Sequence, residues 1–261
     1  MGTKDKFQPA FVLHTRPYRE SSLLVDFFVA NYGRVSVVAR GAQKSKSTRS
    51  LFQPFLPVQI TWLGKSDLKT LAKIEGSGLA IRLSGLQVYL GFYLNELLVR
   101  LLQYGDTQVD LFSTYIQCLR GLSEHPESQE LFLRQFEINL LKSLGYDIDF
   151  NYCSTTRQAI NPDERYFFTP LQGFQPVAGA LSKNNIAESN IAESNVAESN
   201  MAESVIEGRE IMALQNKNYS ARSLKLLKHI LRLQLQALLG DRPLNSRLLY
   251  QQMVSEQMPK R

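Results

Sequence analysis

The sequence predicts an α+β protein in which a small N-terminal antiparallel β-barrel is followed by a mainly α-helical domain. The first eighty residues hold five short apolar runs separated by turn residues, with no room for a crossover helix. From residue 86 the apolar residues recur with the spacing of helices. A length of 261 residues is long for one core and comfortable for two. We therefore expect a barrel over residues 1–80 and a helical domain over residues 81–261.

Each expected strand of the barrel is short and ends at a turn signal. Between residues 22–30 and 34–39, Asn31-Tyr32-Gly33 provides a hairpin turn, because Asn and Gly tolerate the positive φ that such turns need. Five antiparallel strands fit an OB-fold, and an SH3-like barrel would show the same periodicity. The expected strands are residues 10–14, 22–30, 34–39, 57–63 and 68–74.

Four helices are expected in the second domain. Residues 86–104 are apolar nearly all round, as in a buried helix. Residues 107–122 begin with Thr107-x-x-Asp110, which resembles a capping box, and residues 129–144 end before Gly145, an expected C-cap. Residues 220–239 are amphipathic and end at Gly240. One side of this last helix carries a basic row that is either a solvated face or a binding surface: Arg222, Lys225, His229 and Arg232.

Two stretches of the second domain lack helical periodicity. Residues 151–175 are polar, and we expect an irregular segment there. Residues 183–204 hold four tandem copies of Asn-(Ile/Val/Met)-Ala-Glu-Ser. On a helix a five-residue period turns the apolar residue by about 140° per copy, so these residues cannot share a face. Four copies also make only about one turn of a pentapeptide-repeat coil. We interpret this low-complexity segment as a mobile insertion without a function of its own.

The composition is that of a soluble globular protein that stays inside the cell. Hydrophobic residues make up 44% of the chain, yet no stretch reaches the roughly 18 to 20 apolar residues of a membrane helix. The first residues lack the apolar core of a signal peptide. Two cysteines and three histidines are scattered, which indicates a reducing, cytoplasmic compartment without a disulfide framework.

Motifs of known enzymes are missing from the sequence. There is no Gly-x-x-x-x-Gly-Lys-Ser/Thr loop, no Gly-x-Gly-x-x-Gly after a strand and no Gly-x-Ser-x-Gly elbow. No His-x-x-x-His or Cys-x-x-Cys pair offers a metal two ligands on one element. Cys118 lies among apolar residues and is expected in the core rather than as a nucleophile. We expect no catalytic residue, no cofactor and no metal.

Positive charge is concentrated in the first third of the chain. Residues 1–80 carry a net charge of +7, residues 81–180 of −4 and residues 181–261 of +3. No Asp or Glu occurs from Phe27 to Ser66, where Ser and Thr are interleaved with Lys and Arg. Such residues donate to phosphate oxygens without reading bases, which favours a nucleic-acid partner. The predicted DNA-binding residues are Arg16, Arg19, Arg34, Arg40, Lys44, Lys46 and Arg49. The aromatic residues near them either stack on bases or fill the barrel: Tyr18, Tyr32, Phe52 and Phe55.

Several blocks of the sequence resemble the RecO family of bacterial recombination mediators. Their resemblance covers almost the whole chain except residues 180–215, and together the blocks are specific although each alone is weak. The blocks are Ala10–Ser22, Tyr32-Gly33-Arg34 through Ala39-Arg40-Gly41-Ala42, Leu51–Phe55, Tyr93-x-Asn95-Glu96-Leu97-Leu98, Arg134-x-Phe136-Glu137-x-x-Leu140-Leu141-x-x-Leu144-Gly145-Tyr146 and Leu239-Gly240-x-x-Pro243-Leu244-x-Ser246-Arg247.

This resemblance implies an N-terminal OB-fold, a helical domain and a nucleoid-associated DNA-repair function. Members of the family bind single- and double-stranded DNA and anneal complementary strands. With RecR, and with RecF, they help to load RecA onto DNA coated by single-stranded-DNA-binding protein. Many members carry two zinc-binding Cys-x-x-Cys pairs after the Leu-Gly-Tyr block. Here Cys153 stands alone and Thr156 occupies the place of its partner, so we expect no structural zinc.

The resemblance also implies a groove for the acidic, apolar-ended C-terminal tail of the single-stranded-DNA-binding protein. An Arg that forks the terminal carboxylate beside apolar side chains would suit such a tail. The alternative is that Arg134 pairs with Glu130 or Glu137 on its own helix. The predicted tail-binding residues are Leu133, Arg134, Leu141, Arg222, Lys225 and Arg232. An RNA-binding or ribosome-associated OB-fold factor is the alternative function, because a basic barrel does not separate DNA from RNA.

Overall fold

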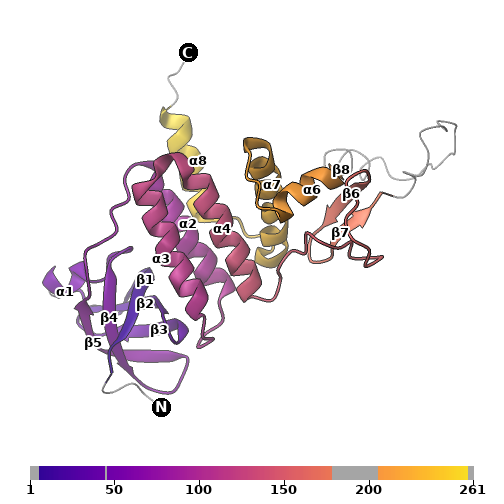
Figure 1. The fold of residues 1–261 in the computed structure, drawn as a ribbon. Helices are drawn as coiled ribbons and strands as arrows, with labels where there is room; N and C mark the ends of the chain where they lie inside the picture. The colour runs from indigo at the N-terminus through magenta and orange to yellow at the C-terminus, as the bar shows by residue number, and fades with distance from the viewer. Residues whose placement is uncertain (1–5, 45, 178–204, 258–261) are drawn as a thin grey trace. The chain divides into compact units, whose positions relative to one another are not determined.

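The structure is a computed structural model that describes residues 6–44, 46–177 and 205–257 (Figure 1). Two compact units are present, Met1–Leu144 with Asp241–Arg261, here called unit 1, and Gly145–Gly240, here called unit 2. The barrel shares unit 1 with the helices that pack against it, so the predicted domain boundary near residue 80 stays a prediction. Within the described ranges, no helix has the length and apolar character needed to cross a membrane. The repeat segment at 183–204 lies outside the described residues.

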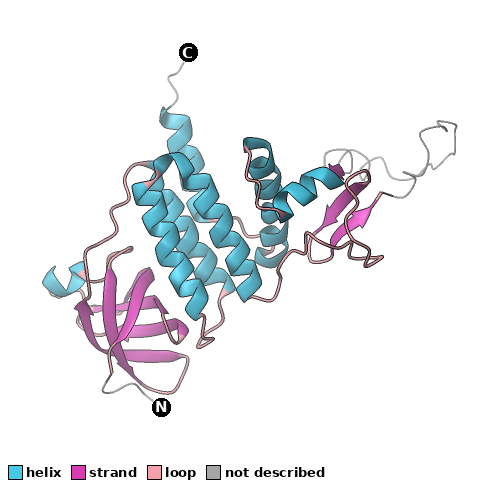
Figure 2. Cartoon of the chain, in the orientation of Figure 1, coloured by secondary structure: helices cyan, strands magenta, loops and turns pink. Residues whose placement is uncertain are grey.

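The first five strands close into a barrel (Figure 2), as the sequence predicts. Its strand order is β1-β2-β3-β5-β4, with a parallel β3–β5 pair and a short helix α1 before β4, which is the five-stranded Greek-key barrel of an OB-fold. These elements are β1 (Gln8–Tyr18), β2 (Ser22–Val29), β3 (Gly33–Ala39), α1 (Lys46–Ser50), β4 (Pro57–Leu63) and β5 (Leu68–Gly76).

Alternating apolar residues place the barrel core inside the strands. On β3 the side chains of Val35, Val37 and Ala39 are buried and pack in one cluster with residues of the other strands. The turn before β3 needs Gly33, which has a φ of 63° and whose missing Cβ would collide with the carbonyl oxygen of Asp106. The hairpin predicted around Asn31–Gly33 is therefore confirmed.

Four helices complete unit 1, namely α2 (Leu86–Leu101), α3 (Val109–Glu124), α4 (Gln129–Ser143) and α8 (Asn245–Gln257). A 3-10 turn, η1 (Pro126–Ser128), leads into α4. The buried Asn95 of α2 joins the helices to the barrel. Its Nδ2 lies 3.2 Å from the carbonyl oxygen of Leu13, and its Oδ1 accepts a 2.7 Å bond from the Tyr115 hydroxyl. Glu96 accepts the backbone N–H groups of Asn245 and Ser246 at the start of α8.

The helix-end predictions for unit 1 had different outcomes. The predicted capping box at Thr107 is wrong, because the Thr107 hydroxyl donates to the carbonyl oxygen of Asn31 and α3 starts after Gln108 without a side-chain cap. Gly145 follows the last turn of α4 with a φ of 77°, as expected of a residue that ends a helix.

The described residues of unit 2 form a small sheet and two helices. The sheet has the order β7-β6-β8, built from β6 (Arg165–Thr169), β7 (Gly173–Pro176) and β8 (Val205–Glu207). The helices are α6 (Gly208–Gln215) and α7 (Ala221–Leu239), and α7 has the expected Gly240 at its end. The expectation of an irregular segment at 151–175 is corrected, because β6 lies inside it and β7 begins there. These strands form because Tyr166, Phe168 and Phe174 are buried together.

Candidate nucleic-acid interface

Six of the seven predicted DNA-binding side chains are exposed on the barrel or on the connection that follows β3. Arg16 lies on β1, Arg19 in the β1–β2 turn, and the others between β3 and the end of α1. None of the ion pairs found in the described part of the chain uses one of them. We call this set the barrel-end cations: Arg16, Arg19, Arg40, Lys44, Lys46 and Arg49.

Strand register brings the first of these cations together at one end of the barrel. Tyr18 pairs with Ser22 at the β1–β2 turn, and Leu23 pairs with Ala39 at the end of β3. Arg19 and Arg40 therefore follow strand ends that lie side by side.

The connection after β3 is fixed to the β1–β2 turn by Gln43, which is not among the predicted site residues. The Gln43 backbone N–H donates to Ser21 over 3.1 Å, and its Nε2 donates to Ser22 over 2.7 Å. A lone Gln in a polar loop gives no pattern by which this tie could be foreseen.

Arg34 is the exception, and its predicted phosphate contact is corrected. Its side chain is only 14% exposed and forms a 3.3 Å ion pair with Asp26. The guanidinium also donates to the carbonyl oxygen of Val99 and lies 4.4 Å from the ring centre of Tyr104. These contacts join the barrel to the last turn of α2 and to the residues after it, at the opposite end of β3 from Arg40.

The four candidate aromatic residues fall into two groups, those that fill the barrel and one that lies at its end. Phe52 and Phe55 are buried, and Tyr32 is half-buried with its ring edge-on to Trp62 at 5.0 Å. These three fill the core or its edge. The half-buried Tyr18 lies under the Arg19 guanidinium, 5.3 Å from ring centre to Cζ, at the barrel end that carries the cations. Of the four, Tyr18 remains available for base stacking.

The predicted tail-binding residues are divided between the two compact units. The side chain of Arg134 is 8% exposed and donates to Glu137 Oε1 over 2.9 Å, and the Tyr93 hydroxyl reaches the same oxygen at 2.6 Å. Leu133 and Leu141 are buried as well. The intrahelical pairing considered as the alternative is what forms, so the Arg134 side chain is closed off. Its other predicted partners, on α7, belong to unit 2.

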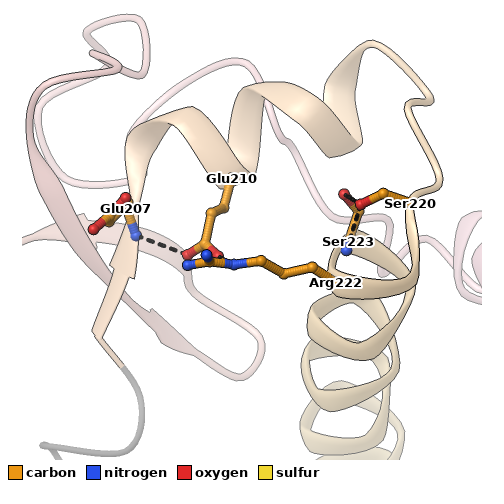
Figure 3. A network of polar contacts seen from close by, with 5 residues as sticks. All are labelled: Glu207, Glu210, Ser220, Arg222 and Ser223. Atoms are coloured by element: carbon orange, nitrogen blue, oxygen red, sulfur yellow. Dashed lines mark hydrogen bonds and ion pairs between the residues drawn. The ribbon is translucent and has the colours of Figure 1, made fainter.

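The basic row on α7 is exposed, but its first member has a partner. Arg222 Nε lies 2.6 Å from Glu210 Oε1 on α6 (Figure 3). Glu210 also accepts the backbone N–H of Glu207 in the capping box of α6. Lys225 and Arg232 lie on the exposed face of α7 and take no part in the ion pairs found among the described residues.

Cys153 lies at the start of a tight turn. Burial alone would raise the pKa of its thiol, but hydrogen bonds from Thr155 and Thr156 outweigh this effect and lower the pKa below its ordinary value. Among the described residues no group of three or more His, Cys, Asp or Glu side chains is placed to hold a metal ion. The absence of structural zinc stays a prediction.

Comparisons with known proteins give the family. The family model "Recombination protein O N terminal" matches residues 4–79, and "Recombination protein O C terminal" matches residues 82–248. A DNA repair protein RecO of Actinobacillus pleuropneumoniae serotype 5b is 36% identical over 97% of this chain and 98% of its own length. One from Tolumonas auensis is 40% identical over 95% of this chain and 96% of its own. One from Yersinia pestis is 36% identical over 96% of both. The chain therefore belongs to the RecO family of DNA repair and recombination proteins.

Proposed function

We propose that the protein is a DNA-binding recombination mediator without catalytic turnover. It anneals complementary strands and, with RecR and RecF, promotes the loading of RecA onto DNA coated by single-stranded-DNA-binding protein. The observation that carries the proposal is the set of exposed barrel-end cations on an OB-fold. Residues 16–22 and 40–50, which supply these six cations, contain a single carboxylate, Glu20.

A surface of this kind suits annealing because it contacts phosphates rather than base edges. Contacts from Lys, Arg, Ser and Thr side chains to phosphate oxygens position the backbone and carry no sequence information directly. The bases of a held strand stay free to pair, while the cations replace condensed counterions and reduce the repulsion between two strands. Ser47 and Thr48 lie within α1, between the cations Lys46 and Arg49.

The decisive experiment measures annealing of complementary oligonucleotides, both naked and coated with single-stranded-DNA-binding protein. The parent protein should accelerate annealing in both states, and an Arg40→Gln/Lys44→Gln variant should be slower. Arg120→Gln/Lys142→Gln is the matched control, because it removes the same charge from exposed positions on α3 and α4. Failure of the parent to anneal coated strands would reject the mediator function. Stronger binding to structured RNA than to single-stranded DNA would favour the RNA-binding alternative.

The proposal includes binding to the single-stranded-DNA-binding protein and to RecR. It does not place either partner on the predicted tail-binding residues. Arg134 already contacts Glu137, and Leu141 is buried, so neither side chain is presented to an acidic tail. Binding of a tail peptide, and of RecR, to the intact protein tests each partner separately from annealing.

A further inference from the structure

One face of α7 is basic over most of the helix. The exposed side chains on it include Lys225, His229 and Arg232, and the 19 residues of α7 contain no Asp or Glu. At 3.6 residues per turn, all the basic residues of α7 fall within an arc of about 120°. We call this set the α7 basic face: Arg222, Lys225, Lys228, His229 and Arg232.

Packing on the other side of α7 fixes how the helix is rotated. Leu227, Ile230 and Leu231 are buried, and so is Gln234. Gln234 Oε1 accepts the backbone N–H of Leu171 over 2.8 Å, and its Nε2 donates to the carbonyl oxygen of Tyr146 over 3.1 Å. With this side held in the core of unit 2, the basic residues must point away from that core.

The α7 basic face is a linear array. Lys225 and Arg232 are seven residues apart, which places them about 10 Å apart along the helix axis. His229 lies between them. In the first turn of α7, Arg222 is paired with Glu210. The side chains in the middle of the helix, Lys225, His229 and Arg232, therefore form the part of the row that is offered to a ligand. A straight row of cations of this length matches the repeated phosphates of an extended strand.

We propose that the α7 basic face binds the sugar–phosphate backbone of a second nucleic-acid strand while the barrel-end cations hold the first. This inference rests on the proposed annealing function, which requires one protein to hold two strands. The two surfaces lie on different compact units. An acidic peptide with an apolar end fits less well, because the Leu and Ile side chains of α7 are buried or half-buried and none is fully exposed to receive that end.

Bridging of two strands by the full chain tests the proposal. One oligonucleotide is fixed to a surface, protein is bound to it, and a labelled non-complementary oligonucleotide is added, so that base pairing cannot capture it. The parent should capture the second strand. The Lys225→Gln/Arg232→Gln variant should bind the fixed strand as the parent does. Its affinity for the second strand should be about ten times lower, which is the effect expected from losing two charge contacts on the surface. Annealing by this variant should slow to a similar extent.

Two controls separate charge from other effects. Lys225→Arg/Arg232→Lys keeps the charge and should bridge as the parent does. Arg120→Gln/Lys142→Gln removes the same charge from unit 1 and should also bridge normally.

Three outcomes would overturn the proposal. The parent protein could capture no second strand, or the Lys225→Gln/Arg232→Gln variant could bridge two strands as well as the parent does. The variant could also bridge normally and lose only its binding of an acidic peptide. The last result would assign the row to a peptide. Failure of the mediator function looks different, since the parent would then bridge strands but not anneal coated DNA.

Discussion

Arg34 and Arg134 show why single residues were the least predictable part of the candidate site. Both are basic residues in family-like blocks, and both form buried ion pairs instead of an open binding surface. The partner of Arg34 is Asp26 on the neighbouring strand, and that neighbour relation depends on strand register, which charge counting does not reveal. The pairing of Arg134 could be predicted from the sequence, because Glu137 lies three residues away on the same helix.

The Arg134 pair gives a sharp stability prediction. Replacing Arg134 with Ala removes one partner of a buried ion pair with Glu137, so the free energy of unfolding should fall by about 3 to 5 kcal/mol. Urea unfolding measures this, and Arg120→Ala on the exposed face of α3 should change stability by less than about 0.5 kcal/mol. Parent-like stability of Arg134→Ala, together with lost binding of an acidic tail peptide, would restore Arg134 as a binding residue.

Cys118 predicts how stability changes at high pH. Burial raises the pKa of its thiol well above the usual range, and the Glu137 carboxylate raises it further. In the unfolded chain the thiol ionises near pH 8.5. The contribution of the buried neutral thiol to the free energy of unfolding is therefore complete below that pH. Above it, the free energy of unfolding should fall by up to about 1.4 kcal/mol per pH unit.

Urea unfolding between pH 8.5 and 10 checks this sign. Cys118→Ala should lose that part of the decline. Cys153→Ala is the matched comparison, because the pKa of Cys153 is lowered and gives no such loss. Equal slopes for Cys118→Ala and the parent would contradict the assignment.

At the scale of elements, the long periodic segments were predictable and the short or polar ones were not. All five barrel strands were expected, yet β1 continues to Tyr18 instead of ending at His14. Its last residues are exposed, so they show no alternation, and they are strand because they pair with β2. The strands β6 and β7 were missed because each is only four or five residues long.

The barrel-end cations predict the salt dependence of DNA binding. Arg40→Gln/Lys44→Gln should weaken binding to single strands of any sequence and flatten the log–log salt slope by about 0.7 per lost contact. Arg34→Gln is the contrasting variant, because it should lower stability and leave the slope unchanged. Titrations at several salt concentrations measure both. An unchanged slope in the double variant would remove the barrel end as the DNA site.

The turn around Cys153 predicts that folding needs no metal. The Cys153 Sγ lies 3.2 Å from the Thr155 hydroxyl, and a structural zinc site normally uses four ligands. The purified protein should contain no stoichiometric zinc by elemental analysis, and a chelator should leave its melting temperature unchanged. Stoichiometric zinc whose removal unfolds the protein would refute this.

For the whole molecule, the sequence foresaw a barrel and helices but not how they group. Asn95 bonds to the backbone of β1 and to Tyr115 of α3, and Glu96 holds the start of α8. These bonds join segments up to 150 residues apart, which local periodicity cannot show. They explain why the C-terminal α8 belongs to the unit that contains the barrel, while residues 145–240 form the other.

The repeats lead to a prediction about the chain as a whole, namely that residues 185–204 can be deleted. The strands on either side of the deleted stretch are held close together, because Pro176 pairs with Tyr166 and Val205 pairs with Phe167 on the same strand β6. Two strand spacings separate Pro176 from Val205, which is about 10 Å. The eight residues 177–184 that remain span up to about 26 Å when extended, so they can close the connection.

Closing this shorter connection should change the free energy of unfolding only slightly, since loop entropy alters by about 0.6 kcal/mol per doubling of length. The deletion variant should therefore unfold within about 1 kcal/mol of the parent and anneal naked and coated strands at the parent rate. Urea unfolding and the annealing assay are to be run on the same preparation. Lost annealing with parent-like stability would show that the repeats act in the reaction, because a shortened connection alone leaves both the barrel-end cations and the α7 basic face in place.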